Sequence, residues 1–200
     1  MKILVVSDEE SNYLWNHYRP GHLKDIDMIL SAGDLKSEYL SFLVTMANRP
    51  LLYIHGNHDA EYDIKPPEGC ECVDDKLLLV NGLRIVGLGG SMMYNQGPHQ
   101  YTERQMKKRI NRLAFNIWRA GGVDIVLTHA PVRGIGDEEG VVHRGFEAFL
   151  PLLDKYKPRY LIHGHVHQSY LASSFERIRK YENTAIINAY DRYIIDTDKD

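Results

Sequence analysis

Residues 51–59 read Leu-Leu-Tyr-Ile-His-Gly-Asn-His-Asp, a short apolar run that ends abruptly in a polar cluster. A continuous apolar run of this length is typical of a β-strand buried on both faces, because a half-exposed strand alternates apolar and polar side chains. Asn57 and His58 therefore follow the carboxyl end of a buried strand. In open α/β sheets, this is where ligands bind.

The same pattern recurs at four other places along the chain. The runs and the polar residues that follow them are 3–6 with Asp8, 27–30 with Asp34, 124–127 with His129, and 160–162 with His165 and His167. Helical periodicity separates the runs, over residues 37–49, from Thr102 to about residue 120, and over 145–156. Thr102 opens the longest helix with a Thr-Glu-Arg-Gln capping box.

Two further segments predict β-hairpins. Residues 77–80 and 83–86 are apolar strands joined by Asn81-Gly82, a dipeptide that favours the tight turn of a hairpin. Residues 185–188 and 193–195 are expected to form a second hairpin. Strands thus alternate with helices over most of the chain, and the hairpins add antiparallel strands to this pattern. We expect one mixed α/β domain spanning residues 1–200.

The composition is that of an ordinary globular protein. Of the 200 residues, 44% are hydrophobic and 26% charged, and the net charge of -3 gives no general reason to expect nucleic acid as a partner. The basic helix from Thr102 is better explained as a solvated face. No run resembles a signal peptide or a membrane span, which predicts a cytoplasmic protein with no membrane partner. The two cysteines, Cys70 and Cys72, are expected to be reduced thiols, and a local disulfide between them is the alternative. Three tyrosines, Tyr94, Tyr101 and Tyr190, could line a pocket or a contact within a homo-oligomer.

The strand endings carry side chains that bind metals. A carboxylate or an imidazole buried without a partner is costly, so five such endings together favour a shared site. Asp34 has two oxygens and can bridge two ions, and Gly164 lets the backbone pass close to the site. Oxygen and nitrogen ligands without thiolate suit Mn, Fe, Zn or Co. Two such ions about 3.5–4 Å apart are the usual arrangement for hydrolysing phosphate esters.

Four motifs, in this order, resemble the calcineurin-like metallophosphoesterase family: Gly33-Asp34, Gly56-Asn57-His58-Asp59, Thr128-His129 and Gly164-His165-Val166-His167. The resemblance implies a four-layer α/β/β/α sandwich with a binuclear metal centre. By analogy, Asp8, Asp34 and His167 hold the first ion. The second is held by the bridging Asp34 together with Asn57, His129 and His165. His58 would act near the leaving group, as a general acid or a hydrogen-bond donor.

One position departs from the family pattern. The family usually opens with Asp-x-His, whereas this chain has Asp8-Glu9-Glu10, so Glu10 stands in place of the histidine. Three alternatives follow: Glu10 binds the first ion, water replaces it, or the first site is largely lost. If Glu10 is a ligand, the additional carboxylate favours harder ions, Mn above Zn.

The resemblance implies a metal-dependent phosphoesterase in which a hydroxide bridging the two metals attacks phosphorus. We expect a small-molecule or nucleotide substrate, and a phosphodiester ahead of a phosphomonoester. Arg133, His143 and Arg144 lie after a predicted ligand and are candidates for binding the substrate phosphate. The alternative function is a non-catalytic scaffold of the same fold that binds protein partners.

Overall fold

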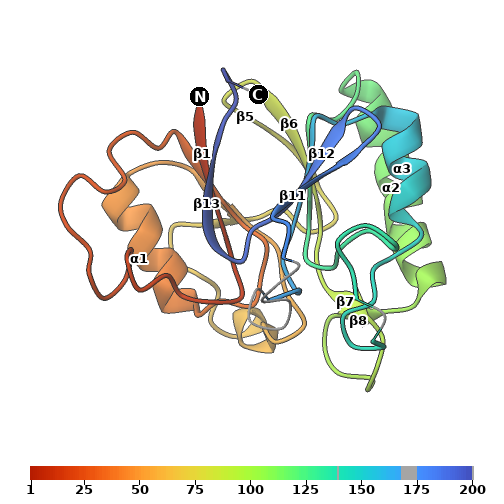
Figure 1. Cartoon of the computed structure of the whole chain (residues 1–200), viewed down its shortest axis with the longest axis horizontal. Helices are drawn as coiled ribbons and strands as arrows, with labels where there is room; N and C mark the ends of the chain where they lie inside the picture. Colours follow the sequence, from red (N-terminus) through yellow and green to blue (C-terminus); the bar gives the residue numbers. More distant parts are fainter. Residues whose placement is uncertain (139, 168–174, 200) are drawn as a thin grey trace.

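Two β-sheets lie face to face between helices in the computed structural model, which describes residues 1–138, 140–167 and 175–199 (Figure 1). The first sheet has the spatial order β13 (Asp191–Asp196), β1 (Lys2–Ser7), β2 (Met28–Ser31), β3 (Leu51–Tyr53) and β4 (Glu71–Cys72). The second has the order β11 (Ile178–Tyr181), β12 (Thr184–Asn188), β10 (Tyr160–His163), β9 (Ile125–Thr128), β6 (Leu83–Leu88) and β5 (Leu77–Val80). Short strands β7 (Ser91–Met92) and β8 (Gln100–Tyr101) form a separate pair.

Strand β1 shows why the apolar runs are continuous. Ile3 and Val5 pack into the core between the two sheets, whereas Leu4 and Val6 pack on the opposite face among residues that include Leu40 of helix α1 (Ser37–Ala47). Because both faces are covered, alternate side chains along the strand enter two different apolar cores.

Helices α2 (Glu103–Arg119) and α3 (Phe149–Tyr156) cover the outer face of the second sheet (Figure 1). Met106 and Leu113 of α2 join Phe149 of α3 in one apolar cluster with Val126 and Leu161 of the sheet. The predicted capping box at Thr102 is present. With α1 on the other side, the chain has the α/β/β/α layers expected from the sequence.

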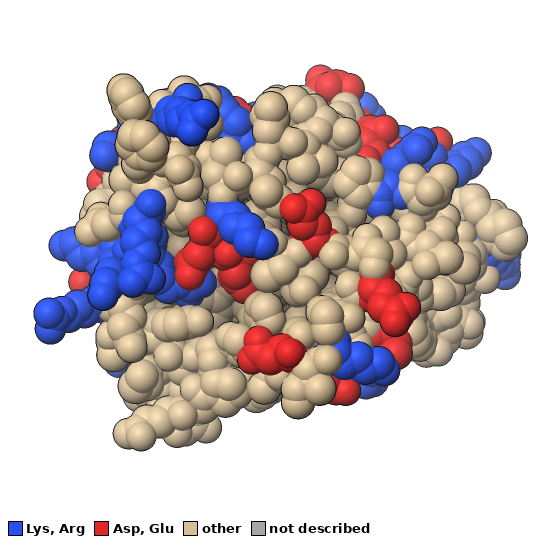
Figure 2. Space-filling view, turned by 180° about the vertical axis from the view of Figure 1, so that it is seen from behind, with Lys and Arg blue, Asp and Glu red and all other residues tan. Residues whose placement is uncertain are grey.

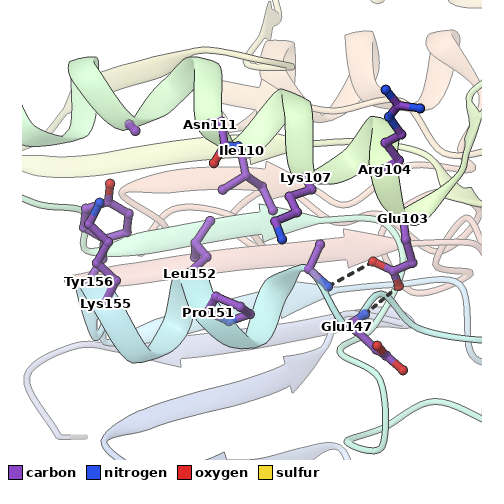
Figure 3. A pocket seen from close by; sticks show the side chains of 12 residues that line it. Glu103, Arg104, Lys107, Ile110, Asn111, Glu147, Pro151, Leu152, Lys155 and Tyr156 are labelled. Atoms are coloured by element: carbon purple, nitrogen blue, oxygen red, sulfur yellow. Dashed lines mark hydrogen bonds between the residues drawn. The ribbon is translucent and has the colours of Figure 1, made fainter.

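The start of α3 differs from the sequence prediction. Helical periodicity extends back to Gly145, but Phe146 N–H donates to the carbonyl of Pro131 at 3.1 Å, so this part of the chain is extended. The helix begins at Phe149, and the Glu103 carboxylate accepts the N–H groups of Glu147 and Ala148 at 2.7 and 3.1 Å (Figure 3). A carboxylate from α2 thus caps α3 and joins the two helices.

Of the two expected hairpins, one is confirmed and one is wrong. Strands β5 and β6 pair antiparallel around Asn81-Gly82, and both turn residues have positive φ. By contrast, β12 pairs parallel with β10 in the second sheet, while β13 pairs antiparallel with β1 in the first. Both strands are apolar and close in sequence, and the sequence contains no signal that the chain passes from one sheet to the other.

The basic residues of α2 form an exposed face. Arg104, Lys107, Lys108, Arg112 and Arg119 are exposed. Lys and Arg side chains gather at the left of Figure 2, the side on which α2 and α3 lie. Arg109 is the exception, because it is buried and bonds to Asp75 and to the Gly89 carbonyl. No helix among the described residues is long and apolar enough to cross a membrane.

Candidate metal centre

A cavity of about 670 Å³ opens where strands of both sheets end. Its lining includes six residues predicted from strand endings, namely Asp8, Asp34, Asn57, His58, His165 and His167. They follow β1, β2, β3 and β10, as the pattern of apolar runs predicts. His129, after β9, is fully buried behind them, with its ring 4.9 Å from that of His165.

His129 links the two sheets at the base of the cavity. Its Nδ1 donates to the carbonyl of Ala32 at 2.7 Å, and its Nε2 lies 3.1 Å from Asn57 Oδ1 and 3.3 Å from Asp34 Oδ2. Burial works to lower the pKa of His129, but the negative charge of Asp34 and its contact with the ring raise it to about 10. Two oxygens thus converge on the nitrogen that the Ala32 carbonyl leaves free, an arrangement in which a cation could replace the proton.

Asp34 is held in a left-handed backbone conformation, with φ of 57°. Its Oδ1 accepts the backbone N–H of His58 at 2.8 Å, while its Oδ2 faces His129. Burial works to raise the pKa of Asp34, but His129 and the His58 amide hold it well below its usual range. Asp34 therefore presents a carboxylate, and not a carboxylic acid, to the cavity.

Asp59 supports this arrangement from behind, a role that the sequence analysis missed. Its Oδ2 accepts the N–H groups of both Asp34 and Gly56, each at 2.7 Å. Burial and the charge of Asp34 raise the pKa of Asp59 to about 7. The available signal was the position of this carboxylate, two residues after Asn57 in a loop that follows a buried strand.

Asp8, His165 and His167 form the other half of the cluster. The backbone N–H of His165 donates to both oxygens of Asp8 at 3.0 Å, and Nε2 of His167 lies 3.4 Å from Asp8 Oδ1. The approach is close because position 164 is glycine: a Cβ there would lie 1.9 Å from Ser7 Oγ and 2.5 Å from Asp8 Oδ2. This agrees with the expectation that Gly164 lets the backbone pass close to the site.

A backbone carbonyl orients the ring of His165, as one does for His129, but through the other ring nitrogen. Its Nε2 donates to the carbonyl of Val142 at 2.7 Å, which leaves Nδ1 as the free ring nitrogen. Burial and the positive charge of His129 lower the pKa of His165 to about 3, so its ring is neutral, the form that binds metals. Ligand atoms of Asp34, His129 and His165 lie within 4.8 Å of one another, close enough to share one ion.

Three loops complete the cavity, after β3, between β7 and β8, and between β9 and α3. His58 has an exposed side chain that lines it from the β3 side. Tyr94 lines it as well, and its hydroxyl accepts the Asn57 amide N–H at 3.2 Å. On the third loop, His143 lies with its ring 5.3 Å from that of His165, and its Nδ1 is 2.7 Å from Glu138 Oε2.

Three predicted residues do not line the cavity. Glu10 accepts the backbone N–H of Lys36 at 3.1 Å, and its other oxygen lies 3.7 Å from Lys36 Nζ. Arg133 forms an ion pair at 2.7 Å with Asp137, four residues further on, through Nη1 of its guanidinium. Arg144 is also absent from the lining. Of the three candidates for phosphate binding, only His143 is at the cavity.

A model of the calcineurin-like phosphoesterase family matches residues 1–169. The chain belongs to this family. Membership of this family supports a metal-dependent phosphoesterase activity in general terms. The cluster of carboxylate, amide and imidazole groups at the strand ends suits the divalent metals that calcineurin-like phosphoesterases use.

The chain is also similar to individual proteins. The protein K07C11.7 of Caenorhabditis elegans, of the group UPF0046, is 26% identical over 212 residues, covering 94% of this chain and 69% of the relative. Among solved structures, TT1561 of Thermus thermophilus has a TM-score of 0.61 at 15% identity, covering 95% of this chain and 89% of that one. GAP50, the anchor in the inner membrane complex of Plasmodium, has a TM-score of 0.55 at 14% identity, with 94% and 70% covered. These two structures share the fold of this calcineurin-like phosphoesterase.

Proposed function

We propose that this calcineurin-like phosphoesterase hydrolyses a phosphodiester in the cavity lined by Asp34 and His58. The observation that carries the proposal is the convergence of Asp34 Oδ2 and Asn57 Oδ1 on His129 Nε2, next to the pair of Asp8 and His167. We propose that Asp34 is the carboxylate that serves both groups of side chains. We also propose that residues 1–200 form one domain.

We propose that the donor atoms of the cavity hold two divalent cations. We propose that Asp8, Asp34 and His167 hold one, and that Asp34, Asn57, His129 and His165 hold the other. Cations bound there would activate water and neutralise phosphoryl oxygens. The set mixes three oxygen-bearing side chains with three imidazoles and has no thiolate, which suits Mn, Fe, Zn or Co. We propose Mn as the first ion to test.

Glu10 is left outside this ligand set. Its carboxylate is engaged at both oxygens by Lys36, which supports the alternative that water takes the place of the family's histidine. The preference for Mn predicted from a third carboxylate is correspondingly weaker.

The chain's own residues would position and protonate the substrate. The backbone of His58 is fixed by Asp34, and its exposed imidazole lines the cavity, from which it can donate a hydrogen bond or a proton to a leaving-group oxygen. His143 lines another part of the cavity, and Glu138 next to it favours a proton on Nδ1. We propose that His143 binds the substrate phosphate.

A second candidate function is a non-catalytic scaffold that binds protein partners. The contact between Glu10 and Lys36 favours it, because it leaves the first cation with one protein ligand fewer than the family pattern. Retention of His58 and of six ligand positions favours the enzyme. The cytoplasmic location and the homo-oligomer stay predictions.

The test is turnover of an aryl phosphodiester and an aryl phosphomonoester by protein stripped of metal and then supplied with Mn, Fe, Zn or Co. We expect diester hydrolysis that depends on the metal and falls about 100-fold or more in His58→Ala. The control is His17→Ala. His17 is exposed and does not line the cavity, so this variant should keep full activity. Folded protein that shows no turnover with any of these ions would support the scaffold instead.

A further inference from the structure

A second group of imidazoles lies on the other side of Gly56 from Asn57. His55 follows β3, and its ring stacks on that of His99 with centroids 4.5 Å apart and planes 23° apart. His99 is largely buried, with only 16% of its side chain exposed. Asp63, at the end of the short helix η1 (Ala60–Asp63), faces both rings.

The three side chains direct ligand atoms toward one another. Asp63 Oδ1 lies 3.9 Å from Nε2 of His55, and Asp63 Oδ2 lies 3.7 Å from Nε2 of His99. All three ligand atoms lie within 4.8 Å of one another. None of these residues belongs to the cavity or to the ligand set proposed for the catalytic metals.

Two features indicate that these nitrogens are arranged for a cation. The Asp74 carboxylate lies 2.7 Å from Nδ1 of His55, which orients the ring and leaves Nε2 directed at Asp63. A carboxylate behind a ligating histidine is the usual support of such a ligand. Nε2 of His99 is buried and has no hydrogen-bond partner among the described residues, which is costly for a polar atom unless a ligand satisfies it.

We propose that His55, Asp63 and His99 bind an additional divalent transition-metal ion of the zinc class. Two imidazoles and one carboxylate are a common set of protein ligands for zinc, with water completing the tetrahedron. Atoms bound at about 2.0–2.1 Å in a tetrahedron lie about 3.4 Å apart. The two nitrogen–oxygen separations, 3.9 and 3.7 Å, exceed this value by about half an ångström or less, and the exposed side chain of Asp63 can move toward both nitrogens. The three ligand atoms lie within 4.8 Å of one another, so binding also requires the two rings to turn toward the ion.

The ion would join three segments that lie close in sequence to residues of the candidate metal centre. These are the end of β3, helix η1 and the loop between β7 and β8. That loop also carries Tyr94, whose hydroxyl accepts the Asn57 amide. A cation on His99 would therefore fix the loop that positions Tyr94, and this is the role that we assign to it.

The experiment measures the zinc content of the protein of residues 1–200. Metal-free protein is titrated with Zn²⁺ against a chromophoric chelator, and bound zinc is measured by elemental analysis after gel filtration. We expect His99→Ala to bind one equivalent less than the wild type. Asp63→Asn should weaken the same equivalent at least tenfold, while the equivalents assigned to the catalytic centre are retained. His22→Ala, which removes an imidazole stacked on Tyr13, is the matched control and should lose none.

Equal zinc content and affinity in the wild type, His99→Ala and Asp63→Asn would overturn the proposal, as would an equal loss in His22→Ala. Asp63 is exposed, so Asp63→Asn keeps the test valid if His99→Ala fails to fold. Cobalt provides a second readout, since a visible d–d band should lose intensity in both variants. The test does not depend on phosphoesterase turnover, so failure of the proposed function and failure of this inference are distinguishable.

Discussion

The backbone N–H of Asp34 donates to Oδ2 of Asp59 at 2.7 Å, and the same oxygen accepts the N–H of Gly56 at 2.7 Å. One buried carboxylate thus ties together the loops that follow β2 and β3. Each loop carries a predicted metal ligand, Asp34 in the first and Asn57 in the second. The separation of these two ligands therefore depends on a residue that does not line the cavity.

Replacement of Asp59 should loosen that connection. In Asp59→Ala, two buried N–H groups lose their acceptor, and we expect a loss of roughly 2 to 4 kcal/mol in the free energy of unfolding. Metal affinity should fall about 10- to 100-fold, as is usual when the support of a ligand is removed. Urea denaturation and metal titration measure the two effects. Asp59→Asn keeps an acceptor oxygen and should stay close to the wild type. An equal loss in both variants would show that the charge, and not the hydrogen bonds, is what matters.

Gly164 allows a second close approach, between the loop after β10 and Asp8. In Gly164→Ala the new methyl group would meet Ser7 Oγ and Asp8 Oδ2, so we expect the Asp8 carboxylate to be displaced. Overpacking of this kind costs about 1 to 3 kcal/mol. Thermal unfolding and metal titration should both detect the change. The control is Gly140→Ala, where a Cβ would meet nothing within 4 Å and the effect should stay within about 0.5 kcal/mol.

The sequence predicts the part of the site that depends on strand endings. A buried strand must be apolar on both faces, so the first polar residue after it marks the edge of the sheet. Five strand endings therefore predict where Asp8, Asp34, Asn57, His129 and His165 lie. The Thr102 capping box and the Asn81-Gly82 turn are equally local signals, and the structure contains both.

The sequence does not predict features that depend on contacts between distant segments. β12 and β13 lie in different sheets, and either sheet would accept the apolar side chains of both strands. The sequence therefore does not reveal that the chain changes sheet here. The direction of the Glu10 side chain is determined by the backbone of Lys36, 26 residues away. His99 is drawn out of solvent by stacking on His55, which a lone histidine in the sequence cannot reveal.

The contact between Glu10 and Lys36 predicts that Glu10 contributes little to metal binding. Because both carboxylate oxygens face Lys36, Glu10→Ala should keep its metal affinity within about threefold of the wild type. Asp8→Ala is the comparison: it removes a predicted ligand whose side chain is fully buried, and should abolish one binding event. Calorimetric titration with Mn²⁺ measures both variants. Parallel losses in the two variants would instead make Glu10 a ligand of the first ion.

The ion pair between Arg84 and Asp124 predicts how stability depends on pH. Nε and Nη2 of Arg84 donate to the two oxygens of Asp124 at 2.8 and 2.6 Å, between β6 and the start of β9. These hydrogen bonds hold the pKa of Asp124 below its ordinary value of 3.8. The stability that the ionised group contributes is therefore fully present above about pH 4, and is lost as the pH falls through the lowered pKa.

Asp124→Asn should accordingly lose about 1 to 2 kcal/mol at pH 7, since a neutral amide keeps the contact without the charge. The difference from the wild type should be constant from pH 7 to about pH 5, and should shrink as the pH falls below 4, where the wild-type carboxylate begins to take up a proton. The midpoints of urea unfolding, measured for both proteins across this pH range, test the prediction. Asp25→Asn, at an exposed carboxylate 3.9 Å from Lys2 Nζ, should change little at any pH. A deficit in Asp124→Asn that stays the same down to pH 3 would mean that the pair contributes through shape and hydrogen bonding alone, because a contribution from the charge must disappear with it.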